Sequence, residues 1–359
     1  MKLEFRKYVS LVCLVLTILG WPCVGSAKEI RLSPHEYWQI SEAFKEFQYP
    51  SDETLKNFSR QMEGKNVFRV AINDASRITD VGMAALAKLP IKELDITQGT
   101  FNGKCLSLFR DLCILRLYGC TRLTDDGLAA IQQIPGLVDL TIYYAPQITP
   151  SGFAKIAEIK QLQKLDLCLD QLDDSWFLLQ NLDDLSDLKT LSVTGRFGKD
   201  IFKAISHFPD LNSISVSQWV HKAGFLIFLI PGLELPKLTE ALDVYVWDWQ
   251  EIITPLGELQ HLEHLEILGN IIINGGENRF FPPNFAKLKS FAVLSDTMEI
   301  PEIFLEKMYD AMPGLEALNL PVTPLTGKAL LQFMERNPAL DIGMSGKRAI
   351  EYAKEVLEE

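Results

Sequence analysis

The chain has 359 residues, of which 47% are hydrophobic and 23% charged, so it has enough apolar side chains to bury a core. Its formal net charge of −12 becomes −14 without residues 1–27, because Lys2, Arg6 and Lys7 outnumber Glu4 by two in that segment. Phosphate groups bind basic surfaces, so this balance argues against nucleic acid and against an anionic membrane surface as partners. A total charge does not, however, describe a local patch.

Residues 1–27 have the pattern of a secretory signal peptide. A basic start precedes an apolar run over residues 11–21, and small residues follow at positions 25–27. The run is shorter than the roughly 20 residues that span a bilayer. We therefore predict cleavage after Ala27, export to a periplasm, a cell surface or the medium, and no membrane span afterwards. An uncleaved N-terminal anchor and lipidation at Cys23 are the alternatives.

Two helices are predicted within residues 28–66. The first, over residues 33–47, begins with the capping box Ser33-Pro34-His35-Glu36 and carries apolar residues near helical spacing. The second starts near Ser51 and places Leu55, Phe58 and Met62 on one face.

A leucine-rich pattern then recurs at intervals of about 21 to 27 residues. Its clearest copy reads LxxLxLxxCxxLTDxGL and runs from Leu112 through Cys120 to Leu128. Close copies begin at Val67 and Leu137, and weaker copies of the strand part begin at Leu162, Leu188, Leu211, Leu262, Leu288 and Leu315. The unit near Ile91 has a shortened second half, and the frame slips by about one residue over residues 238–246. With these two included, we count about eleven units.

This pattern resembles the cysteine-containing class of leucine-rich repeats, which includes F-box-type and ribonuclease-inhibitor-like repeats. The resemblance covers residues 67–346 and implies an α/β solenoid shaped as a horseshoe, with a parallel concave β-sheet and outer helices. A solenoid exposes its core at both ends, so residues 28–66 and a C-terminal helix over residues 347–359 are expected to be helical end caps. Related repeats serve as substrate receptors of ubiquitin ligases, but residues 28–66 do not look like an F-box.

The TDxGL corner of each unit is expected to be structural. Thr and Asp can cap the start of the helix that follows, and Gly tolerates a close approach of chain segments. The resemblance implies that Cys120 and Asn270 bond or pack against the adjoining turn.

No catalytic, metal or cofactor motif is recognisable, so we predict a protein that is not an enzyme and needs no cofactor. The cysteines after residue 27 are Cys105, Cys113, Cys120 and Cys168, and their spacing does not support a zinc site. Cys120 and Cys168 are two repeats apart, about 10 Å at ordinary strand spacing, which is too far for a disulfide, whereas a Cys105–Cys113 bridge is conceivable. His261 and His264 are interpreted as a pair at a strand entrance rather than as metal ligands.

The residues between and just after the ladder leucines should face the concave surface, because side chains alternate along a strand. The positions between the last two ladder residues are Asp95, Arg116, Thr141, Asp166, Ser192, Ser215 and Glu266, and those just beyond are Asn73, Thr97, Tyr118, Tyr143, Cys168, Thr194 and Ser217. Exposed Tyr, Trp and Arg are enriched at binding hot spots. The predicted ligand-binding residues are Arg116, Tyr118, Tyr143, Tyr144, Asp166 and Tyr245. The alternative is that these aromatic side chains only cover the sheet.

The sequence therefore predicts a non-catalytic, exported binding scaffold that recognises a protein, peptide or glycan through its concave face. One alternative is a structural protein that assembles with itself in an envelope or matrix. A ubiquitin-ligase-type substrate receptor is less favoured, because the leader indicates export.

Overall fold

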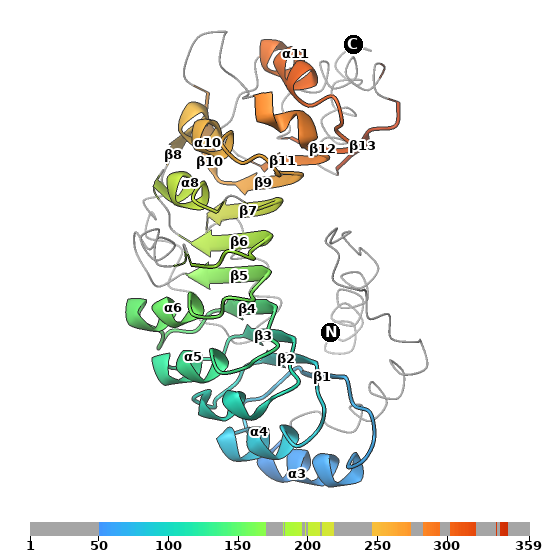
Figure 1. Cartoon of the computed structure of the whole chain (residues 1–359), viewed down its shortest axis with the longest axis vertical. Helices are drawn as coiled ribbons and strands as arrows, with labels where there is room; N and C mark the ends of the chain where they lie inside the picture. Colours follow the sequence, from blue (N-terminus) through green and yellow to red (C-terminus); the bar gives the residue numbers. More distant parts are fainter. Residues whose placement is uncertain are drawn as a thin grey trace, which may run out of the picture.

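The computed structural model describes residues 50–169, 182, 184–195, 198, 200–208, 210–218, 246–273, 283–294, 302–320, 335 and 338–343. In these ranges the chain forms one elongated stack, with a parallel sheet on the inner side of a shallow arc and helices on the outer side (Figure 1). The sheet has eleven strands in the order in which they occur along the chain. The predicted α/β leucine-rich-repeat solenoid is therefore confirmed. The predicted leader, the helix at 33–47 and the helix at 347–359 lie outside the described residues.

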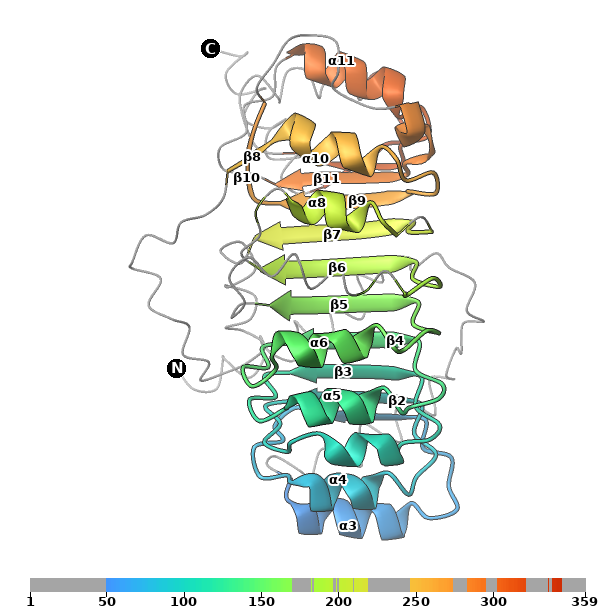
Figure 2. The same ribbon diagram turned by 60° about the vertical axis from the view of Figure 1, so that its left-hand side comes forward.

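Neighbouring strands of the sheet run in the same direction, and the described helices lie on its outer side (Figure 2). The strands of the sheet are β1 Arg69–Ile72, β2 Glu93–Thr97, β3 Ile114–Tyr118, β4 Asp139–Tyr143, β5 Lys164–Leu169, β6 Thr190–Gly195, β7 Ser213–Gln218, β9 His264–Leu268, β11 Ser290–Leu294, β12 Ala317–Asn319 and β13 Asp341–Ile342. The outer segments are α3 Asp52–Gln61, α4 Asp80–Leu86, η1 Lys104–Leu108, α5 Asp125–Ile131, α6 Pro150–Ile156, α8 Asp200–Ile205, α10 Trp249–Leu256, η2 Pro283–Lys287 and α11 Glu302–Ala311. No helix in the described part is both long and apolar enough to span a bilayer.

The leucine ladder forms the core between the sheet and the helices. In β3, Leu115 and Leu117 are completely buried, while the alternate residue Arg116 faces the opposite side of the sheet. Across the sheet, strand register aligns one buried apolar residue from every repeat, in the order Val70, Leu94, Leu115, Leu140, Leu165, Leu191, Ile214, Leu265, Phe291, Leu318 and Ile342. A slip of one residue would turn these side chains to the concave face, so burial fixes the register.

In the main sheet, β7 pairs directly with β9. The unit predicted with a frame slip over residues 238–246 lies outside the described residues up to position 245. Its described end, Val246, begins β8 (Val246–Asp248), which pairs with β10 (Asn270–Ile272) in a separate two-stranded sheet. The apolar residues that follow have helical spacing and form the buried side of α10. They are Trp249, Ile252, Ile253 and Leu256. At the far end, the short strand β13 was not anticipated from the sequence pattern.

A carboxylate from one repeat holds the start of the next repeat's helix. Asp125, the first residue of α5, accepts hydrogen bonds from the backbone N–H of Thr149 at 2.8 Å and from Thr149 Oγ1 at 2.5 Å. Asp52 does the same for Thr79, at 2.7 and 2.6 Å, and also accepts from the N–H of Gly82 at 3.1 Å. Sequence reasoning expected Thr and Asp to cap their own helix. Thr79 does so, accepting from the N–H of Val81 at 3.2 Å, whereas these carboxylates act between repeats. We call this contact the inter-repeat clamp.

The clamp extends to helix α3 and passes through the shortened unit. In α3, Ser51 and Asp52 occupy the positions that Thr and Asp have in a repeat, and Ser51 is the N-cap, near the helix start expected from the sequence. In the shortened unit, Asp80 accepts from the N–H groups of Asn102 and Cys105. The carbonyl oxygen of Asn102 then accepts from the N–H and the hydroxyl of Thr124, both at 3.3 Å. A backbone oxygen thus substitutes for the missing carboxylate.

The clamp explains the glycine of the TDxGL corner. A Cβ atom added to Gly152 would overlap the Asp125 carboxylate, and one added to Gly82 would overlap that of Asp52. At Gly127 the same atom would lie 2.5 Å from the carbonyl oxygen of Asn102. Glycine is needed here because the preceding repeat occupies the space of a side chain.

The ladder cysteine has a packing role, as predicted. Cys120 is completely buried, and a Cβ atom on Gly99 of the preceding turn would lie only 2.9 Å from its sulfur. Burial raises the pKa of this thiol to about 12, so the group stays protonated and unreactive at neutral pH. Cys105, Cys113, Cys120 and Cys168 are not linked to one another by disulfides.

We expect Gly152→Ala to destabilise the protein by about 1 to 3 kcal/mol, because the new methyl group displaces the Asp125 carboxylate. At an unobstructed helix position the same change would stabilise by up to about 1 kcal/mol, so the sign is informative. Urea unfolding followed by circular dichroism measures the effect. Gly136→Ala is the control, since its nearest atom would be the Leu112 oxygen at 3.4 Å. Equal stability of the two variants would contradict the clamp.

Candidate functional site on the concave face

Three rows of side chains cross the concave face in strand register. The middle row contains Asp95, Arg116, Thr141, Asp166, Ser192, Ser215 and Glu266, and the last row contains Thr97, Tyr118, Tyr143, Cys168, Thr194 and Ser217. Both alignments were predicted and are confirmed, except that Asn73, predicted in the last row, follows the end of β1 and has no aligned partner. A first row, which sequence reasoning did not consider, contains Arg69, Glu93, Ile114, Asp139, Lys164, Thr190, Ser213 and His264. The same alternation that gave the other two rows could have identified it.

The first and middle rows join in a network of ion pairs centred on Arg116. Arg116 Nη1 lies 2.5 Å from Glu93 Oε1 and 3.0 Å from Asp95 Oδ1, and its Nη2 lies 3.5 Å from Asp139 Oδ2. Arg69 Nη2 pairs with Asp95 at 2.8 Å, and Lys164 Nζ lies 3.5 Å from Asp139. We call Arg69, Glu93, Asp95, Arg116, Asp139 and Lys164 the concave charge network.

The positive charge of Arg116 is paired with three carboxylates, so this side chain is not free to bind an anion. Burial on its own would lower its pKa, but the neighbouring Asp95, Asp139 and Glu93 outweigh this effect and raise the pKa above the ordinary value. The side chains of Arg116 and its three partners are only 13–22% exposed. The network therefore presents alternating charges, held in fixed positions by one another, over β1 to β5.

The tyrosines lie differently from the expectation. Tyr143 is only 6% exposed, because its hydroxyl group donates to the carboxylate of Asp166 on β5 at 3.0–3.1 Å. Its ring contacts Tyr118 edge to face, with ring centroids 5.5 Å apart. Burial and Asp166 raise the pKa of Tyr143 well above that of an ordinary phenol. The expectation of an exposed side chain is thus wrong for Tyr143, whereas Tyr118 is half-buried.

Tyr144 is half-buried and has a left-handed backbone, with φ at 57°. Gln98 and Gly119 follow β2 and β3 at the equivalent place and have φ values of 60° and 65°. The left-handed region is uncommon for a side chain of this bulk. The turn geometry of three successive repeats thus sets the backbone of Tyr144. Tyr245, the remaining predicted contact, lies outside the described residues.

Strands β6 and β7 present hydroxyl groups without charges. They contribute Thr190, Ser192, Thr194, Ser213, Ser215 and Ser217, of which Thr194 and Ser217 are completely buried. Ser215 Oγ donates to Glu266 of β9 at 2.9 Å, which ends this uncharged strip.

Several buried polar atoms of the concave rows have no hydrogen-bond partner among the described residues. These are Asp139 Oδ1, Thr194 Oγ1, both ring nitrogens of His264, and Asn319 Oδ1. All four residues lie on strands of the main sheet and face its concave side. Buried polar groups are nearly always satisfied in native proteins, so exceptions are informative. Burial lowers the pKa of His264, which favours the neutral imidazole. Within the described ranges, no cluster of three His, Cys, Asp or Glu residues could hold a metal ion.

Comparison with known proteins yields similarities of fold. No family model matches the chain, and no curated protein matches it. Among solved structures, the crystal structure of a TLR13-ssRNA13 complex is 14% identical with a TM-score of 0.48, over 76% of this chain but only 34% of that one. The internalin inlF from Listeria monocytogenes is 14% identical with a TM-score of 0.42, over 85% and 93% of the two chains. The Rad7 and Elc1 complex in yeast gives 16% identity and a TM-score of 0.41, over 96% and 93%. Similarities this distant carry no information about a ligand.

We expect Arg116→Leu to destabilise the protein by about 2 to 3 kcal/mol, because three poorly exposed carboxylates lose their common partner. Thermal or urea unfolding measures the change. The matched control is Lys155→Leu, which removes a single exposed ion pair with Glu158 and should cost less than about 1 kcal/mol. If both variants unfold like the parent, the concave charge network does not form in solution.

Proposed function

We propose that this chain is a non-catalytic binding scaffold that holds a protein or peptide ligand on its concave face. The observation that supports this most directly is the concave charge network, whose six side chains are aligned by strand register and remain 13–32% exposed. At the outer turns, the carboxylates of Asp52, Asp80 and Asp125 are used by the neighbouring repeat. Partly exposed charged groups in fixed positions are those that a ligand of complementary charge can contact.

The size and charge pattern of the rows favour a macromolecular ligand. Seven adjacent strands from β1 to β7 are about 29 Å wide at ordinary strand spacing, which is comparable with one side of a standard protein interface. Fixed alternating charges over β1–β5 specify register and orientation, and the hydroxyl groups of β6 and β7 offer hydrogen bonds. We place the contact around Arg116, Tyr118, Tyr144 and Asp166, with the buried Tyr143 positioning Asp166.

A glycan ligand is the second candidate, and the strip of hydroxyl groups on β6 and β7 favours it. Carboxylates in the charge network disfavour a nucleic acid on this face. The pattern of residues 1–27 supports export, so we propose that the ligand is met in a periplasm, at a cell surface or in the medium.

Obstruction of the middle row tests the proposal. Ser192→Arg places a large cation between Asp166 and Ser215 on the concave face, whereas Gln133→Arg adds the same side chain to the exposed outer side, just after α5. The immobilised chain and both variants are used to capture partners from an extract of exported proteins. We expect the captured protein to be lost with Ser192→Arg and retained with Gln133→Arg.

Retention by both variants would contradict binding on the concave face. Light scattering without ligand tests the alternative of a self-assembling structural protein. Such a protein forms larger species as its own concentration rises. Unchanged melting temperatures of the variants show that the loss of capture is not a loss of folding.

A further inference from the structure

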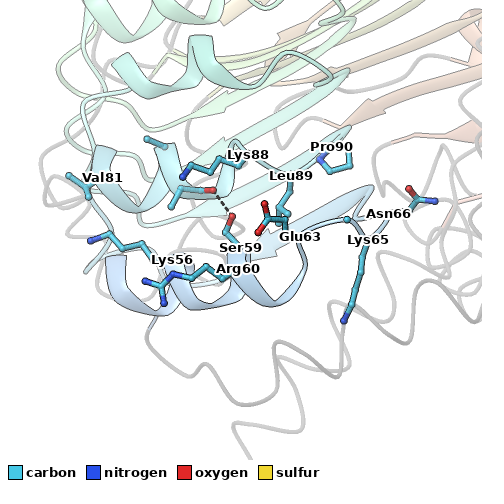
Figure 3. A pocket seen from close by; sticks show the side chains of 13 residues that line it. Lys56, Ser59, Arg60, Glu63, Lys65, Asn66, Val81, Lys88, Leu89 and Pro90 are labelled. Carbon is cyan, nitrogen blue, oxygen red and sulfur yellow. Dashed lines mark hydrogen bonds between the residues drawn. The ribbon is translucent and has the colours of Figure 1, made fainter.

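A groove on the outer surface, unrelated to the concave rows, lies between helices α3 and α4 (Figure 3). It encloses about 660 Å³, which is within the range of ligand sites. One wall carries Lys56 and Arg60 of α3 and Glu63 just after that helix, and the other carries Val81 and Ala84 of α4 and Lys88 just after it. Lys56 and Arg60 are four residues apart and Val81 and Ala84 three, so each pair lies on one helix face.

The groove has a fixed floor. Ser59 of α3 is buried and donates a 2.7 Å hydrogen bond to the carbonyl oxygen of Ala85 in α4. This bond ties the two helices together at the base of the groove, and it is drawn in Figure 3. The small side chains of Ala84 and Ala85 leave the space above it open. The groove is therefore built on the packing of α3 against α4, and the turns after the two helices, residues 63–66 and 88–90, complete its lining.

The charge of the groove is opposite to that of the chain. Its lining contains the four cations Lys56, Arg60, Lys65 and Lys88 and the single carboxylate Glu63, in a protein with a net charge of −12. Glu53 pairs with Lys56 at 3.9 Å and with Arg60 at 3.7 Å, but all three side chains are largely exposed and these pairs are weak. Lys65 and Lys88 are exposed and have no ion-pair partner among the described residues. An anionic ligand fits this lining.

The groove also offers apolar contacts. Val81 is 56% exposed, and Leu108 is the other exposed large apolar side chain in the described part of the chain. Leu89 and Pro90 close one end of the lining. A bare inorganic anion would not use these contacts. A ligand that combines carboxylates with an apolar side chain would use both.

We propose that the α3/α4 groove binds an acidic peptide segment of a partner protein, with at least one apolar side chain seated on Val81. The wall from Lys56 to Glu63 is about 10 Å long at the helical rise, which accommodates about three residues of an extended peptide. Basic side chains on both sides of the groove would flank such a peptide, and Val81 would receive its apolar side chain. This assignment is independent of the function proposed for the concave face.

Fluorescence anisotropy with defined peptides tests the assignment. The probe is a fluorescein-labelled hexapeptide of alternating glutamate and leucine, with glutamine–leucine and lysine–leucine peptides as its controls. We expect the full chain to bind the glutamate peptide only, and to bind it less tightly as salt is raised. The double variant Lys65→Glu/Lys88→Glu should lower the affinity by at least about tenfold.

Matched variants separate the contributions. Lys203→Glu reverses one charge on α8, half of the change in the double variant, away from the groove, and should leave affinity nearly unchanged. Val81→Ser removes the apolar contact without removing charge and should lower the affinity for the peptide by about threefold to tenfold. These side chains are exposed, so the variants are expected to keep the parent's melting temperature.

Other outcomes overturn the proposal. Equal binding of the glutamate and glutamine peptides, or no binding of either, would remove the acidic specificity. Full competition by inorganic phosphate together with no effect of Val81→Ser would indicate a simple anion site. Dimerisation that rises with concentration and is lost in the double variant would mean that a second copy of this chain occupies the groove.

Discussion

The bond between an aspartate of one repeat and the first turn of the next determines much of this structure. A stack of repeats needs more than apolar burial, because apolar surfaces alone allow neighbours to slide and rotate. Asp125 reaches across the junction to the amide and hydroxyl of Thr149, and the absence of a side chain at Gly152 makes room for it. Threonine, aspartate and glycine in the repeated corner are therefore one device shared between neighbours, and the sheet behind it keeps its register.

A sheet ordered in this way brings charged residues of successive strands within contact distance. Parallel strands lie about 4.8 Å apart, so the side chains of Glu93, Arg116 and Asp139 on three neighbouring strands are held within contact distance. Opposite charges at such positions are stabilising, whereas like charges would repel. The result is a surface whose charges are fixed in place before any ligand arrives. Binding to it requires little reorganisation, although each ligand charge must compete with a partner already present.

The sequence was sufficient to predict the ladder, the sheet and two of the three concave rows, because these follow from the alternation of Leu115, Arg116 and Leu117 repeated along the chain. Pairing across strands was harder to predict. Two of the three partners of Arg116, Glu93 and Asp139, come from the first row, which was not considered, and the burial of Tyr143 depends on Asp166 in the following repeat. The irregular unit expected over residues 238–246 lies almost wholly outside the described residues, and helical spacing follows it in α10.

The inter-repeat clamp has a direction, since each described carboxylate acts on the repeat that follows it and never on the one before. Helix α3 takes part in the clamp through the carboxylate of Asp52, which is the first in the described series of clamps. A ribosome releases a chain in the same order. Each aspartate therefore leaves the ribosome before the threonine that it will hold, and a partly synthesised chain can complete one junction after another without waiting for its C-terminal end.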